Sequence, residues 1–200
     1  MAEPRYQRRK EDRPQEITEA AFSVFAEKGY AAARVEEVAQ RAGVSKGLLY
    51  LYFRTKEELF KAVVKSVVER RLDALLQAVE TTDLSAEEFI RGPLLDFMKR
   101  VPGSPIAIVI RLLISEGQRH PDLVDYYWDH VVSKGLTAIS QFIERGVERG
   151  EFRKTAVSDL PQLVLAPMML SMIWRLIFAK RELDTDLLME TQIDMLLAWI

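Results

Sequence analysis

Apolar residues recur at steps of three and four positions along almost the whole chain, which is the spacing of one face of an α-helix. Glycine, proline and short polar runs interrupt this pattern at intervals. No stretch alternates apolar and polar residues as a half-buried strand does, and no internal repeat is visible. The pattern therefore predicts an all-α protein, with helices expected over residues 14–29, 35–42, 46–52, 55–79, 89–101, 106–115, 122–149, 160–180 and 186–200.

The stretch from residue 34 to residue 56 has a more specific order than a repeated apolar stripe. Apolar residues at i, i+3, i+4 and i+7 line one face of a short helix over residues 35–42. Gly43 directly after it can take the left-handed conformation that ends a helix, and Ser45 can cap the next helix through its hydroxyl oxygen. We therefore expect two short helices joined by a tight turn.

The second of these helices, residues 46–52, is not composed like a core helix. Its apolar anchors are Leu49 and Phe53. The positions turned away from these anchors carry residues that suit phosphate oxygens and base edges, namely Lys46, Gly47, Tyr50 and Tyr52.

A third helix is expected to begin at Lys56, after a capping box formed by Thr55 and Glu58. A cation in the first turn of a helix is unfavourable for the helix dipole. We therefore expect Lys56 to meet an anion outside the protein.

The order of these segments resembles the helix-turn-helix of the TetR family of transcriptional repressors. The resemblance runs from about Ile17 to Leu59 and is carried by AAFSVFAEKGY, VEEVAQRAGVSKG, LYLYF and TKEEL. It implies that Lys46, Gly47, Tyr50, Tyr52 and Lys56 contact DNA, and the predicted set is completed by Arg34, Val44, Ser45 and Leu48. The two lysines are assigned to phosphate attraction, the tyrosines to positioning, and Val44, Ser45, Gly47 and Leu48 to the fit at base edges.

Two positions depart from the family pattern. The family usually has Ser or Thr where this chain has Ala33 and Arg34, so the hydroxyl cap of the first motif helix is missing, although Glu37 keeps the reciprocal position. Such a loss costs about 1 kcal/mol. Leu48 stands where the family favours a small, often hydroxylated residue, and its side chain can touch a thymine methyl instead.

Charge changes the picture through its distribution rather than its total. The chain has a net charge of −2, but residues 1–56 carry 11 Lys+Arg against 8 Asp+Glu, and residues 57–200 carry 17 against 22. A basic end on an acidic body is expected when one domain docks on phosphates, although uneven surface charge arising by chance gives the same numbers. Residues 1–13 form a basic segment without periodicity, which is either an arm that reaches the minor groove or a solvated tail.

Other chemistries find little support. The chain has no cysteine, which excludes disulfides, Fe–S clusters and Cys-based zinc sites. The segment GVSKG, residues 43–47, matches the G-x-S-x-G pattern of a hydrolase, but a helical pattern precedes Ser45 where a strand is required. His120 and His130 lie ten positions apart, lack metal-site spacing and are interpreted as surface histidines. We therefore expect no catalytic residue, metal or cofactor.

The N-terminus lacks the apolar core of a signal peptide, and no window reaches about 18 uninterrupted apolar residues. The sequence therefore predicts a soluble, cytoplasmic protein without a membrane partner.

The chain after residue 56 is rich in aromatic and methionine side chains. The family resemblance implies that this bundle encloses an effector pocket and that its last two helices pair with a second subunit. We assign the pocket to Phe97, Met98, Arg111, Tyr126, Tyr127, Trp128 and Trp174, and the subunit interface to Met168, Met172, Arg175, Leu188, Ile193 and Leu196. Ordinary core packing is the alternative for each aromatic residue. Arg111 and Arg175 interrupt apolar runs, and an internal salt bridge is the simplest expectation for both.

The expected organisation is a flexible basic arm over residues 1–13, a helix-turn-helix DNA-binding domain over residues 14–55, and a helical effector-binding and dimerisation domain over residues 56–200. The expected function is a one-component transcriptional regulator, a repressor that binds a palindromic operator as a homodimer and is released by an unknown small-molecule effector. The alternative is a helical ligand-binding or adaptor protein without sequence-specific DNA binding, which the departures at Ala33, Arg34 and Leu48 slightly favour.

Overall fold

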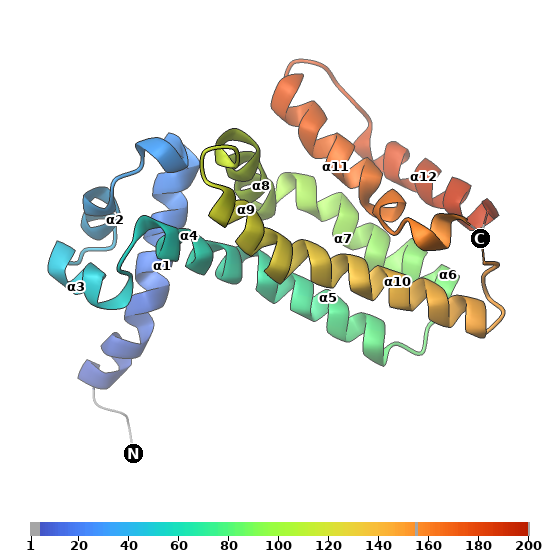
Figure 1. Ribbon diagram of the computed structural model, residues 1–200, viewed down its shortest axis with the longest axis horizontal. Coiled ribbons are helices and arrows are strands. Elements are labelled where there is room, and N and C mark those ends of the chain that lie inside the picture. The colour runs from blue at the N-terminus through green and yellow to red at the C-terminus, as the bar shows by residue number, and fades with distance from the viewer. Residues whose placement is uncertain (1–4, 155, 200) are drawn as a thin grey trace. The chain divides into compact units, whose positions relative to one another are not determined.

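The computed structural model describes residues 5–154 and 156–199, with side chains for residues 12–154 and 158–198. Helices and loops account for these described residues, and no β-strand occurs among them (Figure 1), which confirms the all-α prediction. The chain divides into two compact units. Unit 1 comprises Met1–Glu69 and Ile108–Tyr127, and unit 2 comprises Arg70–Ala107 and Trp128–Ile200.

Unit 1 is built around the longest helix of the chain. Its elements are α1 (Arg5–Ala32), α2 (Val35–Arg41), α3 (Lys46–Tyr52), α4 (Lys56–Val64), the π-helical segment η1 (Lys65–Glu69), most of α8 (Pro105–Glu116) and α9 (Pro121–Tyr127). The rings of Phe25, Tyr30 and Phe60 contact one another, with centroids 5.5 to 6.2 Å apart. These rings belong to α1 and α4, so they fix the helix that follows the motif against the helix that precedes it.

The start of α1 differs from the prediction. α1 begins at Arg5, so residues 5–13, expected as a flexible arm, belong to the helix. Arg, Gln, Lys and Glu are good helix formers, and the backbone hydrogen bonds of a helix need no apolar stripe. The predicted end at Gly29 is confirmed, because Gly29 has φ 78° and interrupts the helical backbone there.

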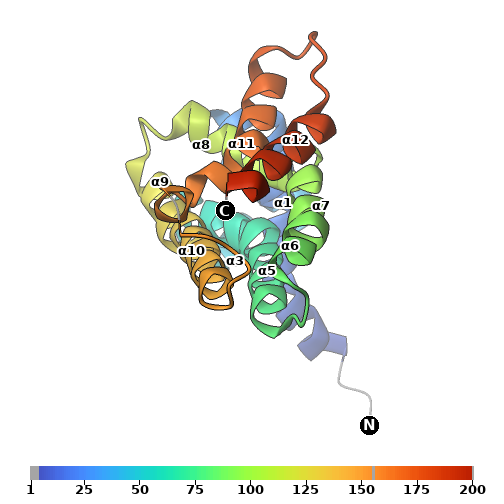
Figure 2. The same ribbon diagram turned by 90° about the vertical axis from the view of Figure 1, so that its right-hand side faces the viewer.

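Unit 2 is a helical bundle whose helices are joined by short irregular turns. Its elements are α5 (Arg70–Thr81), α6 (Ala86–Phe89), the π-helical η2 (Ile90–Leu94), α7 (Leu95–Arg100), the 3₁₀ turn η3 (Val101–Gly103), the π-helical η4 (Trp128–Val132), α10 (Ser133–Glu148), the 3₁₀ turn η5 (Ala156–Asp159), α11 (Gln162–Ile177) and α12 (Thr185–Trp199). Figures 1 and 2 show α11 and α12 side by side, and α5 beside α10. Pro93 lies in η2, where the missing N–H is accommodated by a π-helical turn rather than by a break.

The compact units do not follow the predicted boundary after residue 55. Unit 1 continues to Glu69 and takes in residues 108–127, because α4 packs on α1 and α9 packs on α4. Two of the points at which the chain passes between the units adjoin π-helical turns, η1 and η4. The assignment of separate functions to residues 14–55 and 56–200 stays a prediction.

Candidate nucleic-acid interface and effector cavity

The turn between α2 and α3 forms as predicted. Gly43 has φ 64°, in the left-handed region that glycine tolerates. The hydroxyl oxygen of Ser45 accepts a hydrogen bond from the backbone N–H of Leu48 at 3.1 Å and so caps α3. Because α2, a helix, precedes it, Ser45 is a capping residue and does not occupy the strand–turn–helix setting of a hydrolase nucleophile.

The helices before and after α3, namely α2 and α4, differ in how their first turns are capped. The Arg34 side chain has no acceptor atom, so α2 relies on Glu37, whose carboxylate accepts from the backbone N–H of Arg34 at 3.4 Å. At the start of α4, the hydroxyl oxygen of Thr55 accepts from the backbone N–H of Glu58 at 3.1 Å, as predicted. In a capping box the Glu58 carboxylate would accept from the backbone N–H of Thr55. Here it accepts from the backbone N–H of Arg54, one residue earlier, at 2.7 Å.

The exposed face of α3 carries four residues, two on each side of the buried anchor. Leu49 is fully buried and anchors the helix, whereas Tyr50 is 39% exposed. The face that we call the α3 surface consists of Lys46, Gly47, Tyr50 and Leu51. Leu51 is 80% exposed and was given no role in the sequence analysis, although its place four residues after Gly47 puts it on the same face.

The remaining predicted DNA contacts border this surface. Arg34 and Ser45 are exposed, and the side chains of Val44, Leu48 and Tyr52 are half-buried. Leu51 therefore offers more apolar surface to a thymine methyl than Leu48 does.

Gly47 has no explanation within the fold. It lies in α3 without a positive φ, and among the described residues a Cβ built on it would meet no atom within 4 Å. A glycine inside a helix costs about 1 kcal/mol relative to alanine. The stability of α3 would therefore be better served by alanine, whereas glycine leaves room for close approach from outside.

Lys46 is exposed and forms an ion pair with Glu36 of α2. The hydrogen bond from Lys46 lowers the pKa of Glu36, and Glu36 in turn raises the pKa of Lys46. The Lys46 ammonium also lies 5.8 Å from the centroid of the Tyr50 ring. Exposed pairs of this kind contribute little to stability, so the pair with Glu36 leaves the Lys46 ammonium accessible at the surface.

Lys56 has the opposite environment, which corrects its predicted role. Its ammonium donates to the backbone carbonyls of Tyr30, Ala31 and Ala33 at 2.8, 3.1 and 3.1 Å, and lies 4.6 Å from the centroid of the Tyr30 ring. All three N–H bonds are used at the C-terminal end of α1, where helix carbonyls lack partners and carry partial negative charge. Burial lowers the pKa of Lys56, and nearby Glu116 opposes this effect. The expected outside anion is therefore replaced by the protein's own carbonyls.

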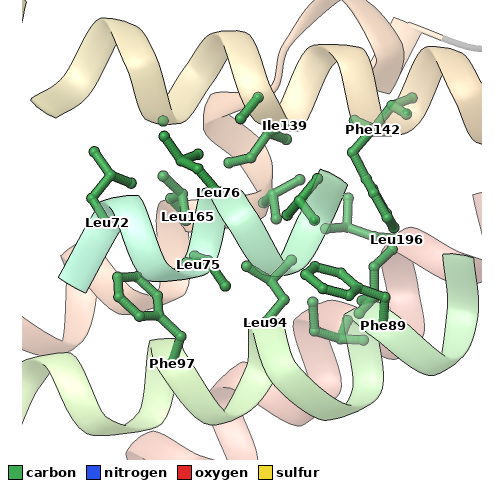
Figure 3. A pocket seen from close by; sticks show the side chains of 17 residues that line it. Leu72, Leu75, Leu76, Phe89, Leu94, Phe97, Ile139, Phe142, Leu165 and Leu196 are labelled. Atoms are coloured by element: carbon green, nitrogen blue, oxygen red, sulfur yellow. The ribbon is translucent and has the colours of Figure 1, made fainter. Parts of the chain in front are cut away.

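Unit 2 contains a cavity of about 70 Å³. Figure 3 shows side chains from α5, α10, the α6–α7 segment, α11 and α12 converging on it. The 17 described residues that line it are apolar or glycine: Leu72, Leu75, Leu76, Val79, Phe89, Ile90, Leu94, Phe97, Gly135, Ala138, Ile139, Phe142, Ile143, Val164, Leu165, Ile193 and Leu196.

Phe97 is the predicted pocket residue that lines this cavity, and the others lie elsewhere. Met98 is fully buried in the core of unit 2. Trp128 is 53% exposed, and the indole N–H of Trp174 donates to the carbonyl of Arg181 at 3.0 Å. Aliphatic residues at helical spacing supply most of the lining, and their pattern does not distinguish cavity from core.

The remaining three predicted pocket residues belong to unit 1. Arg111 is exposed and donates to the carbonyl of Ala26 at 2.8 Å, so a carbonyl replaces the expected salt bridge. The Tyr126 hydroxyl donates to Glu69 at 2.9 Å, and Tyr127 is half-buried.

Four of the six residues predicted for the subunit interface are buried within the chain itself. Met168, Met172, Ile193 and Leu196 are between 1% and 8% exposed, so they are covered by their own subunit. Ile193 and Leu196 in fact line the cavity, Leu188 is half-buried and Arg175 is exposed. The exposed large apolar residues of α11 are Leu163, Met169, Leu170, Ile173, Leu176 and Ile177, and four of them form one stripe, which we call the α11 stripe: Leu163, Leu170, Ile173 and Ile177.

His120, expected on the surface, is half-buried and packs edge-on against Tyr30 with centroids 4.9 Å apart. Within the described part of the chain, no group of His, Cys, Asp and Glu residues could hold a metal ion. Within the same residues, no helix has the length and apolarity needed to cross a bilayer.

Both parts of the chain match models of known families. Residues 17–63 match the bacterial regulatory proteins of the tetR family, and residues 91–197 match the tetracyclin repressor-like C-terminal domain. The chain belongs to the TetR family. It is therefore a transcriptional regulator with a helix-turn-helix DNA-binding domain.

Curated relatives of this TetR-family chain include both repressors and activators. It is 30% identical over 162 residues to the transcriptional repressor AcnR of Corynebacterium efficiens, covering 81% of this chain and 80% of AcnR. It is 41% identical over 73 residues to the transcriptional activator FasR of Mycolicibacterium smegmatis, covering 36% of this chain and 33% of FasR. Family membership alone therefore leaves the direction of regulation open.

Solved structures agree with the fold. A TetR-family regulator from Mesorhizobium loti superposes with a TM-score of 0.78 at 20% identity, over 98% of both chains. FadR from Bacillus subtilis, in complex with stearoyl-CoA, superposes with a TM-score of 0.75 at 22% identity, over 93% of this chain and 98% of FadR.

Proposed function

We propose that this TetR-family regulator is a repressor that binds a palindromic operator as a homodimer and is released by a small-molecule effector. Gly47 is the observation that carries the DNA contact. It costs helix stability, and a side chain there would meet no described atom beyond its own helix backbone and chain neighbours, yet Gly47 lies on the α3 surface with Lys46, Tyr50 and Leu51. A glycine there lets the backbone of α3 approach a DNA groove closely.

The α11 stripe supports the homodimer. Its four residues are 37% to 62% exposed and follow one another at steps of seven, three and four positions. Such spacing forms one apolar face along a helix, which a second copy can cover. A two-fold dimer of helix-turn-helix proteins reads two half-sites about 34 Å apart, and its operator mirrors the two-fold symmetry.

The cavity of unit 2 supports the effector. An apolar lining is typical of small-molecule sites, and FadR of Bacillus subtilis, which shares the fold, was solved with stearoyl-CoA. An effector releases DNA only to the extent that it binds more tightly to the form with low DNA affinity. Repression is favoured by AcnR, whose similarity extends over most of this chain.

A helical ligand-binding or adaptor protein without sequence-specific DNA binding is the second candidate. The observation in its favour is the weaker capping of α2, where Arg34 replaces a hydroxyl cap.

A pair of glycine substitutions tests the proposal. Gly47→Ala should raise the stability of the protein by up to about 1 kcal/mol, because it improves helix propensity. It should also weaken operator binding by about tenfold, because a methyl group now stands at the DNA. The operator is first obtained by selecting bound sequences from random double-stranded DNA, and affinity is then measured by gel shift.

Gly103→Ala is the matched control. Gly103 is exposed, lacks a positive φ, and among the described residues a Cβ there would also meet no atom within 4 Å. It lies in unit 2 and should leave DNA affinity unchanged. Failure of the wild-type protein to enrich any sequence would refute the repressor and favour the adaptor. Equal affinities of Gly47→Ala and wild type would refute the role of the α3 surface.

A further inference from the structure

The cavity of unit 2 restricts the chemistry of its ligand. Its described lining offers hydrocarbon alone, from residues such as Leu75, Leu94 and Ile139 (Figure 3). A polar group buried there would lose its hydrogen bonds to water without replacement. The part of a ligand that enters the cavity is therefore hydrocarbon, and any polar part stays outside.

The seam between α5 and α10 connects the cavity to the surface. Leu76, Val79 and Ala138 line the cavity and also a surface groove of about 270 Å³ along the same two helices. Two small residues of α10, Gly135 and Ala138, line the cavity, and a Cβ built on Gly135 would reach van der Waals contact with Leu72 of α5 at 3.8 Å. A ligand chain can therefore pass along the seam if Leu76 and Val79 change rotamer.

The groove outside the seam is basic. Lys134 and Arg145 of α10 line it together with one acidic residue, Glu80. Arg145 is half-buried and donates to the carbonyl of Val79 at 3.2 Å, so its guanidinium is positioned at the cavity wall. Arg149 lines an adjoining hollow that shares Val79, Glu80 and Arg145 with the groove. The groove can thus receive an anion next to the apolar cavity.

We propose that unit 2 binds an anionic amphiphile, with its aliphatic chain in the cavity and its head group in the groove against Lys134 and Arg145. This inference rests on the proposed function, because it names the chemical class of the effector. A fatty acid carboxylate and the phosphates of an acyl-CoA thioester share this chemistry, and both place the charge at one end of a hydrocarbon chain.

Four probes separate the parts of the ligand, each measured by isothermal titration calorimetry on the full chain without DNA. Laurate and lauroyl-CoA carry chain and charge, dodecanol lacks the charge, and free coenzyme A lacks the chain. Laurate or lauroyl-CoA, or both, should bind at least about tenfold more tightly than dodecanol and free coenzyme A. Dodecanol lacks the charge-assisted hydrogen bonds, and free coenzyme A lacks the burial of apolar surface. Binding of laurate alone assigns the head to a carboxylate, and binding of lauroyl-CoA alone assigns it to phosphates.

Two variants then locate the site. The double variant Lys134→Gln, Arg145→Gln should lower the affinity for the anionic amphiphile by about tenfold or more and leave the affinity for dodecanol unchanged. The control is the double variant Lys180→Gln, Arg181→Gln, which also removes two positive charges but from residues that follow α11. It should bind the anionic amphiphile with wild-type affinity. Ala138→Leu should fill the seam and lower the affinity for both the anionic amphiphile and dodecanol. A thermal melt checks that this variant is folded.

The proposal is overturned if neither anionic amphiphile binds, if dodecanol or coenzyme A binds equally well, or if the groove variant matches its control. DNA binding is measured separately through the α3 surface. A protein that selects an operator but ignores all four probes would therefore refute this inference and leave the DNA-binding part of the proposed function standing.

Discussion

At the scale of single residues, two lysines that begin neighbouring helices show how one sequence signal can have two structural meanings. Lys46 opens α3 and Lys56 opens α4, and both were assigned to phosphates. Lys46 is exposed beside Glu36, whereas the Lys56 ammonium donates three hydrogen bonds to carbonyls at the C-terminal end of α1. Helix position alone therefore does not identify a DNA contact.

The two lysines should respond oppositely to truncation. Lys56→Ala should lower the free energy of unfolding by about 1 to 3 kcal/mol, because it leaves carbonyls at the end of α1 without a donor. Lys46→Ala should change stability by less than about 0.5 kcal/mol, as is usual for surface positions. It should instead weaken DNA binding and reduce the salt dependence of affinity by about one phosphate contact. Urea denaturation measures the stability, and gel shifts at several salt concentrations measure the DNA affinity and its salt dependence. Equal stabilities of the two variants would contradict the environment assigned to Lys56.

At the scale of elements, α11 has one buried apolar face and one exposed apolar face. Met168 and Met172 face the interior of their own subunit, and Ile173 and Ile177 belong to the exposed α11 stripe. Periodicity predicts an apolar helix here but cannot say which face the chain itself covers.

Neighbouring substitutions on α11 distinguish its faces. Ile173→Glu should convert a dimer to a folded monomer, because a charge in an apolar interface lacks a partner. Met172→Glu should lower stability strongly, by about 3 kcal/mol or more, because it buries that charge in the core. Light scattering coupled to gel filtration gives the mass, and circular dichroism gives the fold. A dimeric Ile173→Glu protein would place the subunit interface elsewhere.

At the scale of the whole molecule, stability should depend on pH through three tyrosines of unit 1. Burial raises the pKa of Tyr30 to about 12, and the nearby carboxylates of Asp122 and Glu57 add to the shift. Burial and the hydrogen bond to Glu69 raise the pKa of Tyr126 to about 12, and burial raises that of Tyr127 to about 12. In the unfolded chain, tyrosine loses its proton near pH 10.

The unfolded state therefore releases protons that the folded state keeps between about pH 10 and pH 12. The stability that these tyrosines contribute is present below pH 10 and is lost as the pH rises toward 12. Urea denaturation at increasing pH should show this loss, and absorbance at 295 nm should show tyrosines that ionise late. Tyr126→Phe should make the loss smaller. A variant with an unchanged pH dependence would exclude Tyr126 from the effect.

The sequence by itself determined the features that depend on neighbours a few positions apart. Gly43, Ser45 and Thr55 act where they were predicted to act, because a helix end and its cap involve residues within about four positions. The all-α class and the resemblance to the TetR family followed from the same local patterns, and the family is confirmed over residues 17–63 and 91–197.

The tertiary structure decided the features that depend on contacts between distant parts of the chain. The carbonyls that bind Lys56 lie 23 to 26 positions away, and the carbonyl that binds Arg111 lies 85 positions away. The cavity was mispredicted for the same reason, since its walls come from five separate segments and only packing shows which apolar faces leave a space. A helical stripe specifies that a face is apolar, whereas the identity of what covers it is settled by the fold as a whole.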